Sequence, residues 1–158
     1  MSSASAPTPT GPVPTVLVLN GPNLGRLGSR EPDVYGTGSL DDLRRALEAD
    51  AAGAAVIDLR QTNDEAELIG WLHEAVDRER PVILNPAAFT HYSYALRDAA
   101  ALVSKAGLTL LEVHLSNPHA REEFRHTSVI SAVATGVIAG LGFGSYRLAL
   151  AHVLGGSR

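Results

Sequence analysis

Short apolar segments alternate with amphipathic ones along this chain, and the alternation limits the fold more than any other feature. The apolar segments are rich in leucine and β-branched residues, as buried strands are, so we expect strands at residues 15–19, 55–59, 82–84, 108–113 and within 133–141. Apolar residues at helical spacing predict helices at 39–52, from 63 or 64 to before 81, at 94–104 and at 145–154. Strands that alternate with helices form a parallel sheet with right-handed crossovers. The expected fold class is therefore α/β, with a doubly wound, five-stranded parallel sheet in three layers.

Capping residues and a proline set the expected helix boundaries. Ser39, with Asp42 three residues later, resembles a capping box at the start of the first helix. Either Asn63 or Asp64 can cap the second helix, and Pro81 prevents the chain from continuing it.

Composition narrows the class of protein. The chain has 158 residues, 45% of them apolar and 19% charged, which predicts a single domain at 14–158 behind a disordered tail at 1–13. A net charge of −4 and scattered arginines argue against nucleic-acid binding. The absence of cysteine excludes thiol chemistry and fits a reducing cytoplasm. We expect no secretory signal, because the first twelve residues lack a basic and an apolar region, and no membrane span, because no apolar run approaches about 18 residues.

Polar residues gather just after three predicted strands, at residues 20–36, 85–91 and 114–119. The carboxyl ends of parallel strands lie at one edge of a sheet, so these segments are expected to form one cleft, with residues 121–125 nearby. The first loop is longer than most connections and contains arginines, asparagines and a tyrosine. Such side chains suit an anionic, hydroxylated small molecule.

Several separated motifs identify a resemblance to one enzyme family. In chain order they are Asn20-Gly-Pro-Asn23, Arg30-Glu-Pro, Tyr35-Gly36, Asn85-Pro, Thr90-His91, Glu112-Val-His114, Ser116-Asn117 and Arg121-Glu-Glu-Phe-Arg125. From about residue 16 to 154 the chain resembles the type II 3-dehydroquinate dehydratases. The resemblance implies a flavodoxin-like fold, a cytoplasmic enzyme of the shikimate or quinate pathway, trimers assembled into a dodecamer, and neither metal nor organic cofactor. The implied reaction is the anti dehydration of 3-dehydroquinate to 3-dehydroshikimate through an enolate.

The resemblance also implies roles for the catalytic residues. Tyr35 is the expected base, and Arg30 is the cation beside it, since a nearby positive charge favours a phenolate. His114 is the expected acid. Glu112 is its orienting partner, because residues two apart on a strand face the same side. Asn23 is expected to position a water against the enolate oxygen.

The remaining family positions are expected to bind the substrate. They are Asn85, His91, Asp98, Leu115, Ser116 and Arg125. Asp98 is expected to reach the site of a neighbouring subunit, and Arg121 to lie near the first loop with a less defined role.

Three departures from the family pattern are expected to affect ligand affinity and the movement of the first loop more than the type of reaction. Ala87 stands where many members have glycine, which matters if that position needs a positive φ. Gly25-Arg26 makes the first loop more cationic. Thr127 lacks a ring that could support the site.

Other functions are less consistent with the sequence. It has no H-E-x-x-H, P-loop or G-x-S-x-G motif for a metal, a phosphate or a serine nucleophile. A binding or sensor protein for a cyclohexanoid acid, without turnover, is the main alternative, and a flavin carrier is a third. Lys105, the sole lysine, is expected at the sheet edge opposite the cleft, which argues against a Schiff-base mechanism.

Overall fold

The computed structural model describes residues 11–29 and 31–155. Arg30 and most of the expected N-terminal tail lie outside the described residues, so both expectations stay predictions. Five parallel strands form one sheet in the order β2-β1-β3-β4-β5. They are β1 (Thr15–Asn20), β2 (Val56–Gln61), β3 (Val82–Asn85), β4 (Leu110–His114) and β5 (Gly136–Ala139). The expected doubly wound, flavodoxin-like sheet is confirmed.

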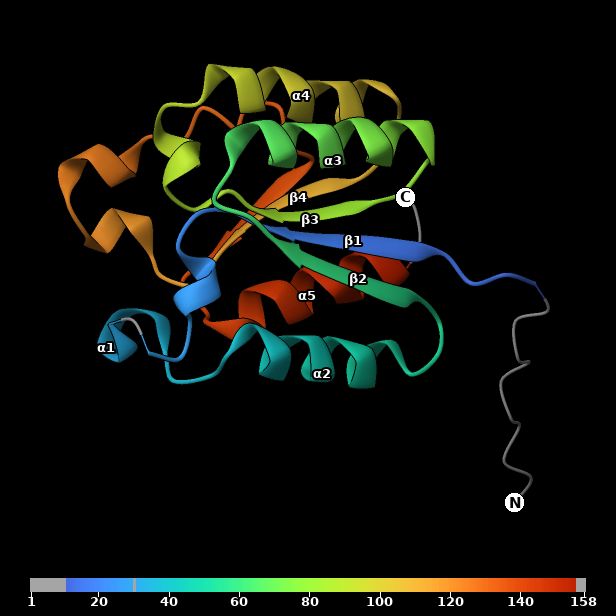
Figure 1. Ribbon diagram of the computed structural model, residues 1–158, viewed down its shortest axis with the longest axis horizontal. Helices are drawn as coiled ribbons and strands as arrows, with labels where there is room; N and C mark the ends of the chain where they lie inside the picture. Colours follow the sequence, from blue (N-terminus) through green and yellow to red (C-terminus); the bar gives the residue numbers. More distant parts are fainter. Residues whose placement is uncertain (1–10, 30, 156–158) are drawn as a thin grey trace.

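Two pairs of helices cover the sheet and make the three layers (Figure 1). Helices α2 (Leu40–Ala51) and α5 (Phe143–Leu154) pack on one face, and α3 (Glu65–Asp77) and α4 (Tyr94–Lys105) on the other. No described helix is long and apolar enough to cross a membrane.

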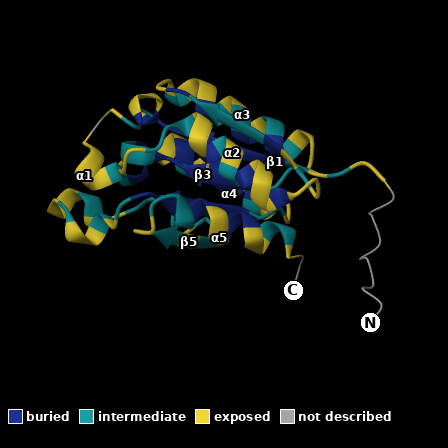
Figure 2. Ribbon diagram, turned by 90° about the horizontal axis from the view of Figure 1, so that it is seen from below, coloured by how far each residue is buried: buried dark blue, intermediate teal, exposed yellow. Residues whose placement is uncertain are grey.

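Alternating side chains of the central strands supply the core on each face. In β1, Val16 and Val18 pack towards α2 and α5, whereas Leu17 and Leu19 pack towards α3 and α4. All four are fully buried, and burial of each such side chain contributes about 1.5–3 kcal/mol. Figure 2 shows the buried strands between helices whose outer surfaces are exposed. This rigid centre fixes where each strand ends.

The capping residues resolve two expectations. Ser39 accepts a hydrogen bond from the backbone of Asp42 and Asp42 accepts one from Ser39, so the capping box at α2 is confirmed. Asp64, not Asn63, caps α3, because its side chain accepts from the Ala66 amide. The side chain of Asn63 instead accepts a hydrogen bond from the backbone of Asn23.

The loops after the strands contain short helices that apolar spacing did not predict. The first loop forms a 3-10 turn, η1 (Leu24–Arg26), and one helical turn, α1 (Pro32–Tyr35). The loop after β3 forms η2 (Ala87–His91), and the segment after β4 forms η3 (Pro118–Ala120) and η4 (Glu123–His126). These turns carry the polar residues at the carboxyl edge of the sheet, on the left of Figure 1.

Candidate active site

A cleft of about 220 Å³ opens at the carboxyl edge of the sheet. Nine residues singled out from the sequence line it: Asn23, Tyr35, Asn85, His91, His114, Leu115, Ser116, Arg121 and Arg125. They come from four separate segments of the chain, as expected for loops that meet at one edge of a parallel sheet. The fold therefore brings most of the predicted site together.

His114 and Glu112 form a buried pair at the end of β4. His114 Nε2 lies 2.5 Å from Glu112 Oε2, and Glu112 is only 1% exposed. Both side chains lie on the face of the sheet covered by α3 and α4, as their two-residue spacing predicted. Because Nε2 is engaged by Glu112, Nδ1 is the nitrogen of His114 that can exchange a proton with a ligand in the cleft.

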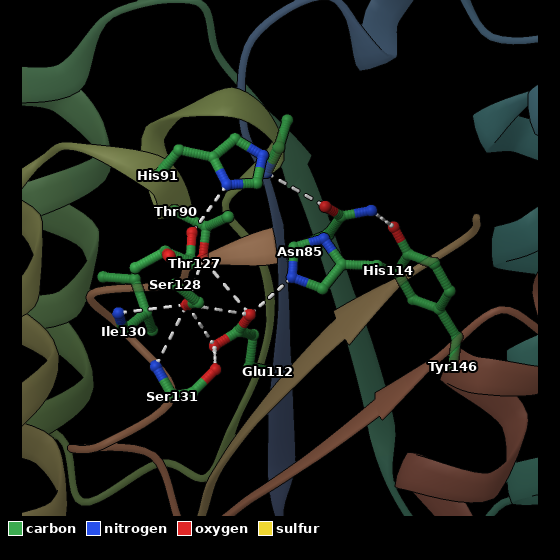
Figure 3. A network of polar contacts seen from close by, with 11 residues as sticks. Asn85, Thr90, His91, Glu112, His114, Thr127, Ser128, Ile130, Ser131 and Tyr146 are labelled. Atoms are coloured by element: carbon green, nitrogen blue, oxygen red, sulfur yellow. Dashed lines mark hydrogen bonds and ion pairs between the residues drawn. The ribbon is translucent and has the colours of Figure 1, made fainter. Parts of the chain in front are cut away.

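Hydroxyl groups surround the Glu112 carboxylate on its other sides (Figure 3). Thr90, Ser128 and Ser131 donate hydrogen bonds to it at 3.2, 3.0 and 2.8 Å. Burial alone would raise the pKa of Glu112, but the hydrogen bond and charge of His114 and the two serine hydroxyls outweigh it and lower this pKa below its ordinary value of 4.5. Glu112 is therefore a carboxylate near neutral pH and can stabilise a positive charge on His114.

Tyr35 and Arg121, which also line the cleft, form a second pair. Arg121 Nη2 donates to the Tyr35 hydroxyl at 2.9 Å, and the guanidinium carbon lies 5.2 Å from the centre of the Tyr35 ring. Arg121 Nη1 also donates to the Ser116 hydroxyl at 3.2 Å. A guanidinium in this position stabilises the negative charge that appears when a phenol loses its proton.

The contact between Arg121 and Tyr35 locates Arg121 in the site, whereas the sequence indicated only that it lies near the first loop. The two residues are 86 positions apart, and no spacing pattern links them. The expected partner Arg30 lies outside the described residues, so its role stays a prediction.

His91, on η2, lies in the cleft with a fixed orientation. Its Nδ1 is 2.8 Å from the carbonyl oxygen of Thr127, and since a carbonyl only accepts, Nδ1 donates. Burial lowers the pKa of His91 below its ordinary value, although the Thr127 carbonyl acts in the opposite direction. The neutral ring then presents Nε2 as an acceptor. The contact to His91 is made by the backbone carbonyl of Thr127. The absence of a ring in the Thr127 side chain therefore does not weaken this contact.

Two residues of the cleft have left-handed backbone conformations. Asn23 has φ of 68° and is held by Asn63, whose Oδ1 accepts from the Asn23 amide at 2.9 Å. Ala87 has φ of 51°, so the position does need a positive φ, as the comparison with glycine suggested. Gly25 packs against Gln61, and a Cβ atom there would lie 2.8 Å from the Gln61 side-chain oxygen.

Three predicted residues lie away from the cleft lining. Glu112 is not part of the lining but bonds His114, which is. Asp98 is on the exposed side of α4, 78% exposed, and pairs with its neighbour Arg97 at 3.2 Å. Lys105 ends α4 and precedes β4, at the edge opposite the cleft, as expected. Among the residues described, no three histidine or acidic side chains are placed to hold a metal ion.

Comparison with known proteins identifies the relatives of this chain. The family model described as dehydroquinase class II matches residues 14–154. A 3-dehydroquinate dehydratase of Salinispora tropica is 59% identical over 145 residues, covering 90% of this chain and 99% of the relative. One of Bacillus licheniformis is 55% identical over 143 residues, covering 90% and 97%.

Solved structures agree with this result. The type II dehydroquinase of Propionibacterium acnes superimposes with a TM-score of 0.85 at 48% identity, covering 90% of this chain and 97% of that one. The type II dehydroquinase of Butyrivibrio crossotus gives a TM-score of 0.86 at 38% identity, covering 92% and 100%. The family model spans most of the chain, and the relatives match along nearly their whole length. The chain therefore belongs to the dehydroquinase class II family.

Proposed function

We propose that this protein is a 3-dehydroquinate dehydratase, which eliminates water from 3-dehydroquinate through an enolate to give 3-dehydroshikimate in the shikimate or quinate pathway. The observation that carries the proposal is that one small cleft holds a tyrosine beside a guanidinium and a histidine beside a carboxylate. A base and an acid on separate segments of one cleft suit an elimination, whereas a binding protein needs neither. The names and structures of the relatives support the same substrate.

The first step is removal of a proton from the carbon beside the ketone. Tyr35, as its phenolate, takes this proton, and the electron pair of the broken C–H bond moves into the enolate. Arg121 holds the phenolate oxygen in place through its hydrogen bond. We expect Arg30 to add a second positive charge. Asn23 positions a water molecule against the enolate oxygen, where the new negative charge gathers.

The second step is loss of the hydroxyl group. His114 Nδ1 gives its proton to the departing oxygen as the enolate electrons form the carbon–carbon double bond and the C–O bond breaks. Glu112 holds His114 through Nε2 and stabilises the imidazolium before the proton leaves. Such acid assistance contributes about 10² to 10⁴ in rate. Tyr35 returns its proton to solvent and His114 regains one, so the balance is one water released and neither a metal nor an organic cofactor is needed.

The other cleft residues hold the substrate. The Ser116 hydroxyl and the Leu115 backbone amide bind the carboxylate, and Asn85 donates to a nearby oxygen. His91 Nε2 accepts from a ring hydroxyl, and Arg125 donates to another. Their position around the cleft supports these roles.

Assembly into trimers completes the site in this proposal, with four trimers in a dodecamer and a cytoplasmic location. Asp98 lies outside the cleft of its own chain, so in this proposal it acts at the site of a neighbouring subunit. Tyr94, Asp98 and Leu102 are spaced four residues apart on α4, and the two apolar ones are 70% and 47% exposed. An exposed face of this kind on a helix is suited to contact with a second copy.

Turnover of 3-dehydroquinate tests the proposal directly. The product has a conjugated enone, so its ultraviolet absorbance should rise on mixing substrate with protein, whereas a sensor protein would bind without any rise. The same mixture treated with borohydride separates the enolate from a Schiff-base route. We expect activity to survive, and inactivation with substrate mass trapped on Lys105 would contradict the mechanism.

A further inference from the structure

A buried chain of three polar side chains runs beneath the cleft. Asn20 ends β1, Asn85 ends β3, and Tyr146 extends from α5 towards both (Figure 3 shows Tyr146 and Asn85). Tyr146 and Asn20 are fully buried and Asn85 is 3% exposed. The three groups lie on the face of the sheet opposite Glu112 and His114, so they are separate from the acid pair.

Asn20 is the end of this hydrogen-bonded series whose orientation is fixed, and it determines which atom donates in each of the other bonds. Asn20 Nδ2 lies 3.0 Å from the Arg60 carbonyl and 3.3 Å from the Val18 carbonyl, and carbonyls only accept, so this end of Asn20 is the amide nitrogen. Its Oδ1 is then an acceptor, and the Tyr146 hydroxyl donates to it at 2.7 Å.

The remaining links follow in the same way. The Tyr146 hydroxyl already donates its hydrogen to Asn20, so it accepts a hydrogen bond from Asn85 Nδ2 at 2.8 Å. Asn85 Oδ1 in turn accepts from the Ala87 amide at 3.0 Å. Turning the Asn85 amide over would set nitrogen against the Ala87 N–H and would break both bonds. One orientation of Asn85 is therefore selected.

We propose that Tyr146 is a positioning residue, whose hydroxyl fixes the Asn85 amide so that its second N–H points to a substrate oxygen in the cleft. The proposal rests on the function proposed above, because it takes Asn85 as a substrate contact. Asn85 is the one member of the three that lines the cleft, so the effect of Tyr146 on a ligand passes through it.

Two further observations agree with this role. Burial raises the pKa of Tyr146 well above its ordinary value, so the phenol stays protonated and keeps both its donor and its acceptor. The bond from Ala87 to Asn85 also starts η2 at a residue with positive φ, and His91 lies at the end of that turn. Fixing Asn85 therefore also helps to fix η2 and with it His91, the second proposed substrate contact.

Tyr146→Phe tests the proposal, since it keeps the ring and removes only the hydroxyl. We expect kcat/KM for 3-dehydroquinate to fall about 10- to 100-fold, because small misplacements of a binding group cost this much. Leu150→Ala is the matched control. Leu150 is fully buried one turn further along α5, so its loss should lower Tm at least as much with kcat/KM unchanged. Equal loss of activity in both variants would overturn the proposal.

A double variant shows whether Tyr146 acts through Asn85. In an Asn85→Ala background, Tyr146→Phe should change kcat/KM by less than about twofold, because the group it positions is already gone. Multiplying losses would overturn the proposal. If Tyr146→Phe does not fold, Asn20→Ser removes the acceptor of the Tyr146 proton, and the same pattern is expected.

A crystal structure of Tyr146→Phe separates this proposal from the proposed function. We expect the Asn85 side chain to leave its position or to occupy a second one, and an unchanged Asn85 would contradict us whatever the activity. If the unaltered protein fails to turn over 3-dehydroquinate, the proposed function fails, while the displacement of Asn85 still decides the positioning role.

Discussion

Tyr35 and Tyr146 have opposite surroundings, and these decide what each can do. Tyr35 lies half-buried in the cleft, where its hydroxyl accepts a hydrogen bond from the Arg121 guanidinium. Tyr146 is fully buried between two asparagines, and this burial raises its pKa and favours its neutral form. The same side chain is thus suited to a base at one position and to a fixed hydrogen-bond link at the other.

Glu112 makes a pH-dependent contribution to stability. Its pKa is lowered by folding, so the folded protein keeps it ionised where the unfolded chain begins to bind a proton. This contribution is present above about pH 4.5 and is lost as the pH falls through the lowered value.

Glu112→Gln should therefore reduce the free energy of unfolding most at neutral pH, by about 1–3 kcal/mol. The difference from the unaltered protein should narrow below about pH 4.5, where this side chain binds a proton first in the unfolded chain and then, at its lowered pKa, in the folded protein. Urea unfolding between pH 7 and pH 3 measures it. Glu67→Gln, an exposed change on α3, should leave no such trend. A difference that stays constant over this range would refute the assignment.

The sequence indicated single residues better than their contacts. Motifs placed Tyr35, His114 and Asn85 in the cleft, where the structure has them. The hydroxyls of Ser128 and Ser131 around Glu112 could not be predicted, because they arrive on a segment without regular spacing. Contacts of this kind depend on how loops fold over the sheet.

Among the elements, the junction between β2 and α3 braces the first loop. Asn63 Oδ1 accepts hydrogen bonds from the Asn23 amide and from Gln61 Nε2, while Gln61 also donates to the Gly21 carbonyl. These bonds hold Asn23 in its left-handed conformation at the edge of the cleft.

Asn63→Ala should lower kcat about 10-fold, because it frees the backbone of the residue proposed to face the enolate oxygen. Asn63→Asp is the control, since its oxygen can accept both hydrogen bonds, and its kcat should stay within about threefold of normal. Steady-state kinetics on both variants measure the effect. Full activity in Asn63→Ala would show that the brace does not matter for turnover.

The regular elements were largely predictable, because each has one periodic apolar pattern. The expected strands and helices all occur, with ends displaced by a few residues, as at α5, which begins at Phe143 rather than 145. The short turns α1, η2 and η4 were missed, since turns of three to five residues bury too little apolar surface to leave a pattern.

At the scale of the whole molecule, Asp98 lies on the exposed side of α4, so its proposed role requires assembly with a neighbouring subunit. We expect light scattering to show trimers or dodecamers in solution. Asp98→Ala should assemble normally but lose activity, whereas Asp77→Ala, at the end of α3, should keep both. A fully active monomer would contradict the proposed use of a neighbouring subunit.

The central claim is that Tyr35 removes the proton from 3-dehydroquinate. The kcat of Tyr35→Phe, measured by the rise of enone absorbance beside the Tm of the same sample, tests it most directly. Phenylalanine keeps the ring but removes the oxygen that takes the proton, so kcat should fall at least about 100-fold with Tm unchanged. A folded variant that keeps more than about a tenth of the activity would show that Tyr35 is not the base.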